Sequence, residues 1–154
     1  MSSDPRTEAT LADVAPALAG AQAEYQRVAY PGVVDLVTRE LLRILSGRLA
    51  HCSICRNLRL RAAVERGFDE SMVAHLEDPE HGDLPERQQV VLRLTRAFLT
   101  DPASFGDADR ETLLTHFSPE QVAELVLDLI RFRPGSKLTV ASGREPVLDG
   151  LVYA

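Results

Sequence analysis

The sequence has 154 residues, of which 45% are hydrophobic and 26% charged, and its formal net charge is −6. This composition is ordinary for one globular domain and excludes a fibrous or largely disordered chain. Because no Lys/Arg-rich run is present, we expect no nucleic-acid partner. The longest apolar stretches are far shorter than the ~20 residues that span a bilayer, and the polar start lacks the apolar segment of a secretory signal. We therefore expect one cytoplasmic domain over residues 1–154 with no membrane segment, residues 1–15 being loosely ordered.

In the first half of the chain, apolar residues recur at the three- and four-residue steps of helices. No segment shows the alternation of apolar and polar residues that is typical of a half-buried strand. We therefore predict an all-α fold. A short helix is predicted over residues 16–27 and a longer one over residues 32–49. Glu40 lies on or beside the apolar face of the longer helix, which is unusual for a carboxylate. A further helix is predicted over residues 52–66, with Gly67 as its stop.

The middle of the chain alternates short helices with turn residues. Asp69 is the predicted N-cap of a short helix that reaches residue 76, and residues 78–83 are predicted to form a loop. The next helix is predicted to open with Pro85 in its first turn. Another is predicted over residues 108–117. These elements belong to one helical domain.

The clearest helix start in the chain is the run Ser118-Pro119-Glu120-Gln121. Ser at the N-cap and Gln three residues later match a capping box, with Pro at the first helical position. Pro134-Gly135 is predicted to break or kink this helix, because proline removes a backbone donor. A final helical segment is predicted over residues 137–142.

The two cysteines, Cys52 and Cys55, form a Cys-x-x-Cys motif at a predicted helix start. A secreted scaffold of this size normally carries more cysteines, so the pair indicates reactivity or metal binding. Backbone N–H groups and the helix dipole stabilise a thiolate there, and the thiolate attacks peroxides and disulfides. The motif alone leaves a redox dithiol, a zinc half-site and two buried core thiols open. Zinc needs about four ligands, and beyond His51 no histidine forms a recognisable ligand pair with the cysteines, so we expect no metal or organic cofactor.

The surroundings of the motif carry a family resemblance. Glu40 lies twelve residues before the first cysteine of Cys52-Ser53-Ile54-Cys55, and a glycine-containing turn, Gly67-Phe68-Asp69-Glu70, follows. These features resemble the AhpD-like branch of the carboxymuconolactone decarboxylase superfamily. The run over residues 117–125 and Gly135-Ser136-Lys137-Leu138 are similar to the C-terminal half of that family. The resemblance covers roughly residues 31–143 and implies an AhpD-like helical domain.

The resemblance implies a thiol-dependent peroxidase or disulfide oxidoreductase with an antioxidant role. Residue by residue, it implies that Cys55 is the peroxidatic nucleophile, Cys52 the resolving thiol and Glu40 the base that begins a proton relay. The helix-dipole argument alone would select Cys52 as the attacking thiol. We follow the family because Glu40 is part of its arrangement. The alternative for Glu40 is a buried carboxylate paired with Arg39 or Arg43.

Two positions depart from the family pattern. AhpD-like peroxidases place a histidine four residues after the second cysteine and often another between the cysteines, where this chain has Arg59 and Ile54. Histidine passes protons near neutral pH, whereas arginine stays charged. On a continuous helix Arg59 lies one turn beyond Cys55 and favours its thiolate; the alternative is a solvated surface arginine. His51 is the candidate to replace part of the relay. We predict a reactive dithiol with weakened peroxide turnover.

Two other functions stay open. A lyase of the decarboxylase branch would use Glu40, His51 and Arg59 to bind and protonate a small anionic lactone. A non-catalytic redox sensor would use the disulfide to switch a partner surface. The resemblance implies a homotrimer, or a hexamer of trimers, together with a hydroperoxide or disulfide substrate and a thiol reductant, whose identity the residues do not specify.

Overall fold

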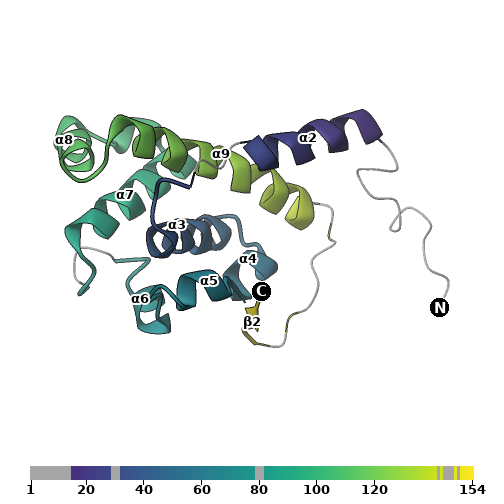
Figure 1. Ribbon diagram of the computed structural model, residues 1–154, viewed down its shortest axis with the longest axis horizontal. Helices are drawn as coiled ribbons and strands as arrows, with labels where there is room; N and C mark the ends of the chain where they lie inside the picture. The colour runs from purple at the N-terminus through teal and green to yellow at the C-terminus, as the bar shows by residue number, and fades with distance from the viewer. Residues whose placement is uncertain (1–14, 29–31, 79–81, 142, 144–147, 149) are drawn as a thin grey trace.

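The computed structural model of the protein describes residues 15–28, 32–78, 82–141, 143, 148 and 150–154 (Figure 1). Apart from residue 15, the segment expected to be loosely ordered lies outside these residues, as does the centre of the loop predicted over 78–83. The described part is mostly helical, which confirms the predicted fold class. Its elements in chain order are α2 (Pro16–Val28), α3 (Leu36–Leu49), α4 (Ser53–Asn57), β1 (Leu58–Arg59), α5 (Arg61–Val64), α6 (Glu70–Ala74), α7 (Glu86–Thr100), η3 (Pro102–Ser104), α8 (Asp107–His116), α9 (Pro119–Ala141) and β2 (Val152–Tyr153).

Helix α3 is the centre of the molecule, because every residue from Thr38 to Gly47 is buried. It contacts α7 and α9 on one side and α4, α5 and α6 on the other (Figure 1). Two apolar clusters fill these contacts. The cluster toward α7, α8 and α9 includes Leu42, Val91, Phe117, Leu125 and Leu129. The cluster toward α5 and α6 includes Leu41, Ile44, Leu45, Ala63, Phe68 and Leu76.

A buried ion cluster fastens α3 to α9, and we call it the α9-side cluster (Arg39, Glu124 and Asp128). The Arg39 Nε donates to Asp128 at 2.6 Å and lies 3.4 Å from Glu124, and both carboxylates are fully buried. Glu124 also accepts hydrogen bonds from three successive backbone amides, at residues 32–34. Buried charges of this kind need partners to offset their lost hydration, and here the partners join three separate segments.

The helix termini follow the predicted capping chemistry at several places. Ser118 and Gln121 form the predicted reciprocal capping box, at 3.0 and 3.3 Å. Asp69 accepts from the Ser71 amide at 2.7 Å, and Gly67 has the positive φ of 96° that suits glycine at a helix end. Helix α3 begins at Leu36 rather than at residue 32, because its N-cap is Asp35.

The pKa of Asp35, the N-cap of α3, lies below its ordinary value. Burial by itself raises the pKa of Asp35, but hydrogen bonds from the Thr38 backbone amide and from Arg87 outweigh it. The Thr38 amide donates to the carboxylate at 2.8 Å. The ionised cap therefore contributes to the start of the central helix.

Other predicted helix boundaries also differ from the structure. The helix predicted over 52–66 is interrupted, and α4, β1 and α5 take its place. Helix α9 runs through Pro134 to Ala141, so the predicted interruption at Pro134-Gly135 is absent, and residues 137–141 of the predicted final segment belong to α9. Pro85 is the N-cap of α7 rather than a member of its first turn.

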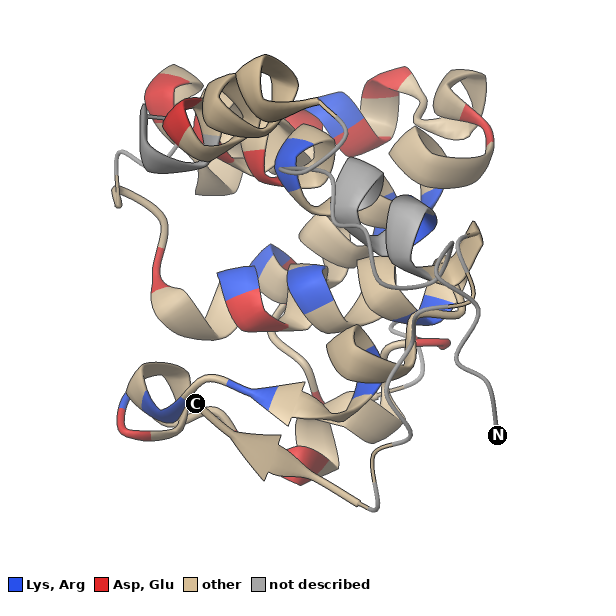
Figure 2. Cartoon of the chain, turned by 90° about the vertical axis from the view of Figure 1, so that its right-hand side faces the viewer, with Lys and Arg blue, Asp and Glu red and all other residues tan. Residues whose placement is uncertain are grey.

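The two short strands were not predicted. β1 pairs with β2 in parallel, with Leu58 opposite Val152 and Arg59 opposite Tyr153. The strands lie side by side at one edge of the molecule, next to the marked end of the chain (Figure 2). None of the helices in the described part is both long and apolar enough to span a membrane.

Candidate functional site

The two cysteines lie together at the junction of α3 and α4. Cys52 is the N-cap of α4, and its amide donates to the Gly47 carbonyl at 2.9 Å. Both cysteines are reduced, with their Sγ atoms 2.8 Å apart, and the Cys55 amide donates to the Cys52 sulfur at 3.4 Å. Cys52 is 1% exposed, whereas Cys55 is half-buried. The pair is therefore placed to close a disulfide, and Cys55 is the thiol more open to solvent.

Gly47 sets how closely the cysteine segment approaches α3. A Cβ built on Gly47 would overlap the Cβ of Cys55 and would lie 3.1 Å from its carbonyl carbon. Only a glycine leaves this space. The close approach at Gly47 was not predicted, although an isolated glycine inside a helical pattern is a signal of close packing.

Glu40 and Arg43 form a second buried ion cluster, the dithiol-side cluster. The Arg43 Nε and Nη2 donate to the two carboxylate oxygens, each at 2.8 Å, and Glu40 also accepts from the Leu60 amide at 3.0 Å. Arg43 in turn donates to the carbonyls of Cys55 at 3.3 Å and Leu58 at 2.6 Å. The pairing with Arg43 is the alternative raised for Glu40, and Arg43 links the carboxylate to the segment that carries the thiols.

The same contacts explain why the helix predicted over 52–66 stops early. A continuous helix would pair the Cys55 carbonyl and the Leu60 amide with backbone groups four residues away. Here Arg43 binds the carbonyl, and Glu40 binds the amide. Side chains distant in sequence thus replace the helical bonds, so α4 has five residues and only a small dipole. The helix-dipole argument for Cys52 loses most of its force.

Arg59 lies away from the position predicted for it. Because α4 ends at Asn57, Arg59 is on β1 rather than one helical turn beyond Cys55. It is 2% exposed, so the alternative of a solvated surface arginine is also wrong. Its guanidinium pairs with Glu70, at 3.2 Å for Nη2, and donates to the Arg56 carbonyl at 2.7 Å. These partners hold the strand and the start of α6 together.

His51 is the exposed residue directly before the motif. Its backbone has a positive φ of 56°, and its amide donates to the Arg48 carbonyl at 3.0 Å. Its side chain lines an open pocket of about 310 Å³ together with Arg48, Arg56 and Glu77. We call this the basic pocket. His51 was a predicted site residue, whereas Arg48 and Arg56 were not. These two arginines lie on either side of His51 in the sequence and come together with it only where α3 turns into α4.

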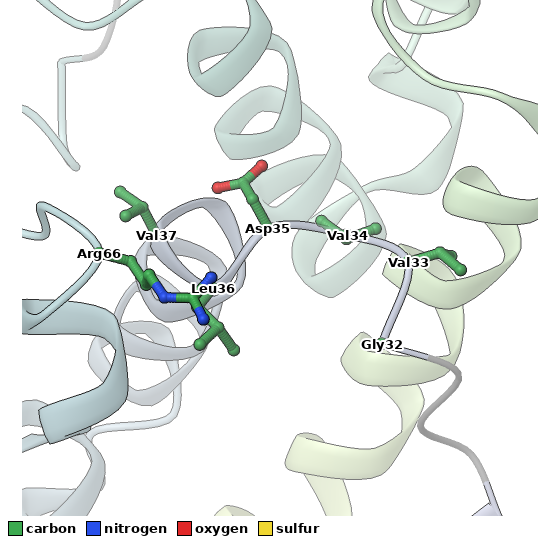
Figure 3. Close-up of a pocket in the computed structure, with 7 residues that line it drawn as sticks. All are labelled: Gly32, Val33, Val34, Asp35, Leu36, Val37 and Arg66. Atoms are coloured by element: carbon green, nitrogen blue, oxygen red, sulfur yellow. The ribbon is translucent and has the colours of Figure 1, made fainter.

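A larger cavity lies elsewhere, at the start of α3. It has a volume of about 470 Å³ and is lined by residues 32–37 and Arg66 (Figure 3). Neither cysteine is part of its lining. Within the described residues, no group of three or more His, Cys, Asp or Glu side chains is placed to hold a metal ion. The site around the thiols thus consists of the two cysteines and the buried Glu40–Arg43 pair, which is linked to them through the Cys55 carbonyl.

Comparisons with known proteins bear on the fold. No protein-family model matches the chain. Uncharacterised proteins from two strains of Mycobacterium tuberculosis are each 27% identical over 119 residues, which is 77% of this chain and 42% of the relative. The chain spans less than half the length of these curated relatives.

One solved structure superposes on nearly the whole chain. It is a protein of unknown function from Agrobacterium tumefaciens, described provisionally as the antioxidant defence protein AhpD, with a TM-score of 0.73 and 15% identity. The superposition covers 91% of this chain and 98% of that chain. At this identity the likeness establishes the arrangement of helices and not an activity. The chain therefore has the AhpD-like helical fold, as the sequence resemblance predicted.

Proposed function

We propose that the protein is a dithiol oxidoreductase that reduces a hydroperoxide or a disulfide, with Cys55 as the attacking thiol and Cys52 as the resolving thiol. The observation that carries the proposal is the pair of reduced sulfurs 2.8 Å apart, one buried and one half-buried. The attacking sulfur of a dithiol must reach its substrate, and the resolving sulfur needs only to reach its partner. The difference in burial therefore favours Cys55 as the nucleophile.

The chemistry balances without a cofactor. The Cys55 thiolate attacks the terminal oxygen of a hydroperoxide, and the O–O bond breaks. The leaving alkoxide takes up the proton that Cys55 lost when it ionised and departs as the alcohol. Cys55 is then a sulfenic acid. The Cys52 sulfur attacks the sulfur of Cys55, and the disulfide forms as water leaves. An external thiol reductant supplies two electrons and two protons to restore the dithiol.

Glu40 is proposed to act through Arg43. Both carboxylate oxygens are bound by the Arg43 guanidinium, and one also accepts from the Leu60 amide. Both oxygens thus already accept hydrogen bonds from donors of the protein itself. We therefore assign Glu40 a positioning role, in which it orients Arg43 on the carbonyl of Cys55. The base role implied by the family is the competing assignment.

Arg59 and His51 receive different roles in the proposal. Arg59 positions the backbone that follows α4, through Glu70 and the Arg56 carbonyl. His51 is exposed beside Cys52 and is proposed to exchange protons with solvent during turnover. Because residue 59 is an arginine, which cannot pass protons near neutral pH as histidine does, we still expect slow peroxide turnover.

The proposal also includes an assembly and a location. The family resemblance implies a homotrimer or a hexamer of trimers. Exposed apolar side chains on three helices, Leu18, Leu114 and Ile130, are compatible with such packing. A cytoplasmic location would supply the thiol reductant that turnover needs.

Thiol mapping by mass spectrometry tests the proposal. The reduced protein is treated with one equivalent of an organic hydroperoxide or a small disulfide, and remaining thiols are blocked before digestion. We expect an intramolecular Cys52–Cys55 disulfide and full recovery of both thiols after a dithiol reductant is added. Cys55→Ser should abolish the fast reaction.

Two results would reject the function. One is the absence of the intramolecular disulfide with either oxidant. The other is a Cys55→Ser variant that reacts as fast as the wild type. A lactone acid turned over equally well by the Cys52→Ser, Cys55→Ser double variant would instead support the lyase alternative. A disulfide that forms once without repeated turnover would support the sensor.

A further inference from the structure

The basic pocket, defined by Arg48, His51, Arg56 and Glu77, is a hollow of which the proposed thiol chemistry uses only His51. It lies at the turn between α3 and α4 and has a volume of about 310 Å³. This is at the lower end of the roughly 300–1,000 Å³ typical of small-molecule sites. The pocket can therefore hold one small organic group rather than a whole macromolecule.

Residues of the basic pocket flank the dithiol along the chain, and neither cysteine is itself part of the pocket's lining. His51 directly precedes Cys52, and Arg56 directly follows Cys55. Arg48 follows Gly47, whose Cα approaches Cys55 so closely that an added Cβ would overlap it. A group bound among these side chains would lie next to the motif.

The pocket is positive on an acidic protein. The chain has a formal net charge of −6, whereas two guanidinium groups here face one carboxylate. Arg48 lies 3.4 Å from Glu77, but the Glu77 side chain is 74% exposed, so solvent weakens the pair. Arg56 is exposed, and its guanidinium makes no hydrogen bond or ion pair with the part of the chain that the structure describes. The Arg56 guanidinium is thus available to a ligand, and the Arg48 guanidinium is held only by a weak, solvent-exposed ion pair.

We propose that the basic pocket binds a carboxylate carried by the substrate and so holds the substrate's reacting bond at Cys55. The inference rests on the proposed dithiol function and names a class of substrate for it. Arginine is suited to this task because its planar fork binds carboxylates through two parallel hydrogen bonds. The carboxylate can belong to an acidic hydroperoxide or to an acidic disulfide.

For a disulfide substrate the step is a thiol–disulfide exchange. The Cys55 thiolate attacks one substrate sulfur, the substrate S–S bond breaks, and one thiolate leaves. The Cys52 thiol then attacks the Cys55 sulfur, the mixed disulfide breaks, and the second substrate sulfur leaves as a thiol with the proton that Cys52 gives up. The substrate gains two electrons, and the protein dithiol is oxidised by two. For a hydroperoxide the balance is the one given above.

Matched acid and ester probes test the inference. The first pair is dithiodipropionate and its dimethyl ester, and the second is a fatty-acid hydroperoxide and its methyl ester. The rate of Cys52–Cys55 disulfide formation is measured for each probe at low ionic strength. We expect the acid of at least one pair to react faster, and the pair showing the preference identifies the source of the carboxylate. In an Arg48→Gln, Arg56→Gln variant the acid-to-ester rate ratio should fall about tenfold, the loss of one charge-assisted contact.

Arg110→Gln is the matched control, because it removes the same charge from α8, where Arg110 pairs with Asp107 at 2.6 Å. Its acid-to-ester ratio should equal that of the wild type. The inference is overturned if esters and acids react equally, if the double variant keeps the wild-type ratio, or if Arg110→Gln lowers the ratio as much. In those cases disulfide formation still supports the dithiol function. A wild-type protein that forms no disulfide with any probe overturns the function and the inference together.

Discussion

Arg39 and Glu40 are neighbours on α3, yet they enter two different buried ion clusters. The α9-side cluster joins Arg39 to two acids of α9, and through Glu124 to three backbone amides at residues 32–34. The dithiol-side cluster joins Glu40 to Arg43, which binds the carbonyls of Cys55 and Leu58. Both clusters place charge in the core. One fixes the scaffold, and the other fixes the segment on which the thiols lie.

The comparison teaches that a buried carboxylate near a cysteine motif is not by itself a catalytic base. Its partners decide what it does. If the two clusters have the roles given above, damage to the α9-side cluster lowers stability without changing thiol chemistry. Damage to the dithiol-side cluster changes both.

The largest effect is expected from Arg39→Met. This substitution leaves Glu124 and Asp128 fully buried without their main cation. Breaking a buried pair by removing one partner typically costs about 3–5 kcal/mol of unfolding free energy. Urea denaturation measures the loss. The rate of disulfide formation per folded molecule should stay at the wild-type value, and a change in that rate would mean that the two clusters are coupled.

A smaller loss of stability, with a change in reactivity, is expected from Glu40→Gln. The amide can still accept from Leu60, and Arg43 keeps its two carbonyl partners, so the cost should be about 1–3 kcal/mol. If Glu40 positions the cysteine segment through Arg43, both Glu40→Gln and Arg43→Met should slow disulfide formation, and by similar factors. The pH profile of the rate should keep its shape in both variants.

If Glu40 is instead the base, the outcomes separate. Glu40→Gln would then remove one ionisation from the pH profile, and Arg43→Met would retain that ionisation. Stopped-flow rates across the pH range distinguish the two assignments without relying on stability.

Gly47→Ala tests the packing of the cysteine segment directly. The new Cβ would overlap that of Cys55, so α4 must shift. We expect the free energy of unfolding to fall by about 1–2 kcal/mol, after allowing for the higher helix propensity of alanine. Misplacement of the thiols should slow disulfide formation by roughly tenfold or more. Gly20→Ala, with nothing near its Cβ, is the control and should not change the rate.

The smallest effect is expected at the N-cap of α3. Asp35→Ala should lower stability by about 1 kcal/mol at neutral pH, the usual value for a lost cap. Because the pKa of Asp35 is lowered in the folded state, its contribution is complete above the ordinary value of 3.8 and is lost as the pH falls below it. The gap between variant and wild type should therefore close in acid. Asp35→Asn, which keeps a capping oxygen, should lose less.

Local sequence signals predicted much of the fold. The capping box at Ser118 and Gln121 formed as predicted, and so did the Asp69 cap and the glycine stop at Gly67. Each depends on residues within three positions of one another. The all-α class was predicted from the helical spacing of apolar residues, which marks the core-facing sides of helices such as α3 and α7.

The interruption after Asn57 could not be predicted in the same way. The residues from 58 to 66 have a helix-compatible pattern, and the break depends on Glu40 and Arg43, which lie on another helix. Tertiary contacts here override local preference. The basic pocket was missed for the same reason, since Arg48 and Arg56 come together only across a turn. The spacing between Glu40 and the cysteines correctly predicted that they lie in one region of the molecule. It did not predict the hydrogen-bond partners of Glu40.

Sulfenic acid trapping is the most direct test of the dithiol assignment. Cys52→Ser and Cys55→Ser are each treated with an organic hydroperoxide in the presence of a sulfenate-specific dione, and the adduct is followed by intact-protein mass spectrometry. If Cys55 attacks and Cys52 resolves, the adduct accumulates on Cys55 in the Cys52→Ser variant, and the Cys55→Ser variant stays unmodified over the same time. Rapid labelling of Cys52 in the Cys55→Ser variant, with slow labelling of Cys55 in the other, would contradict the assignment.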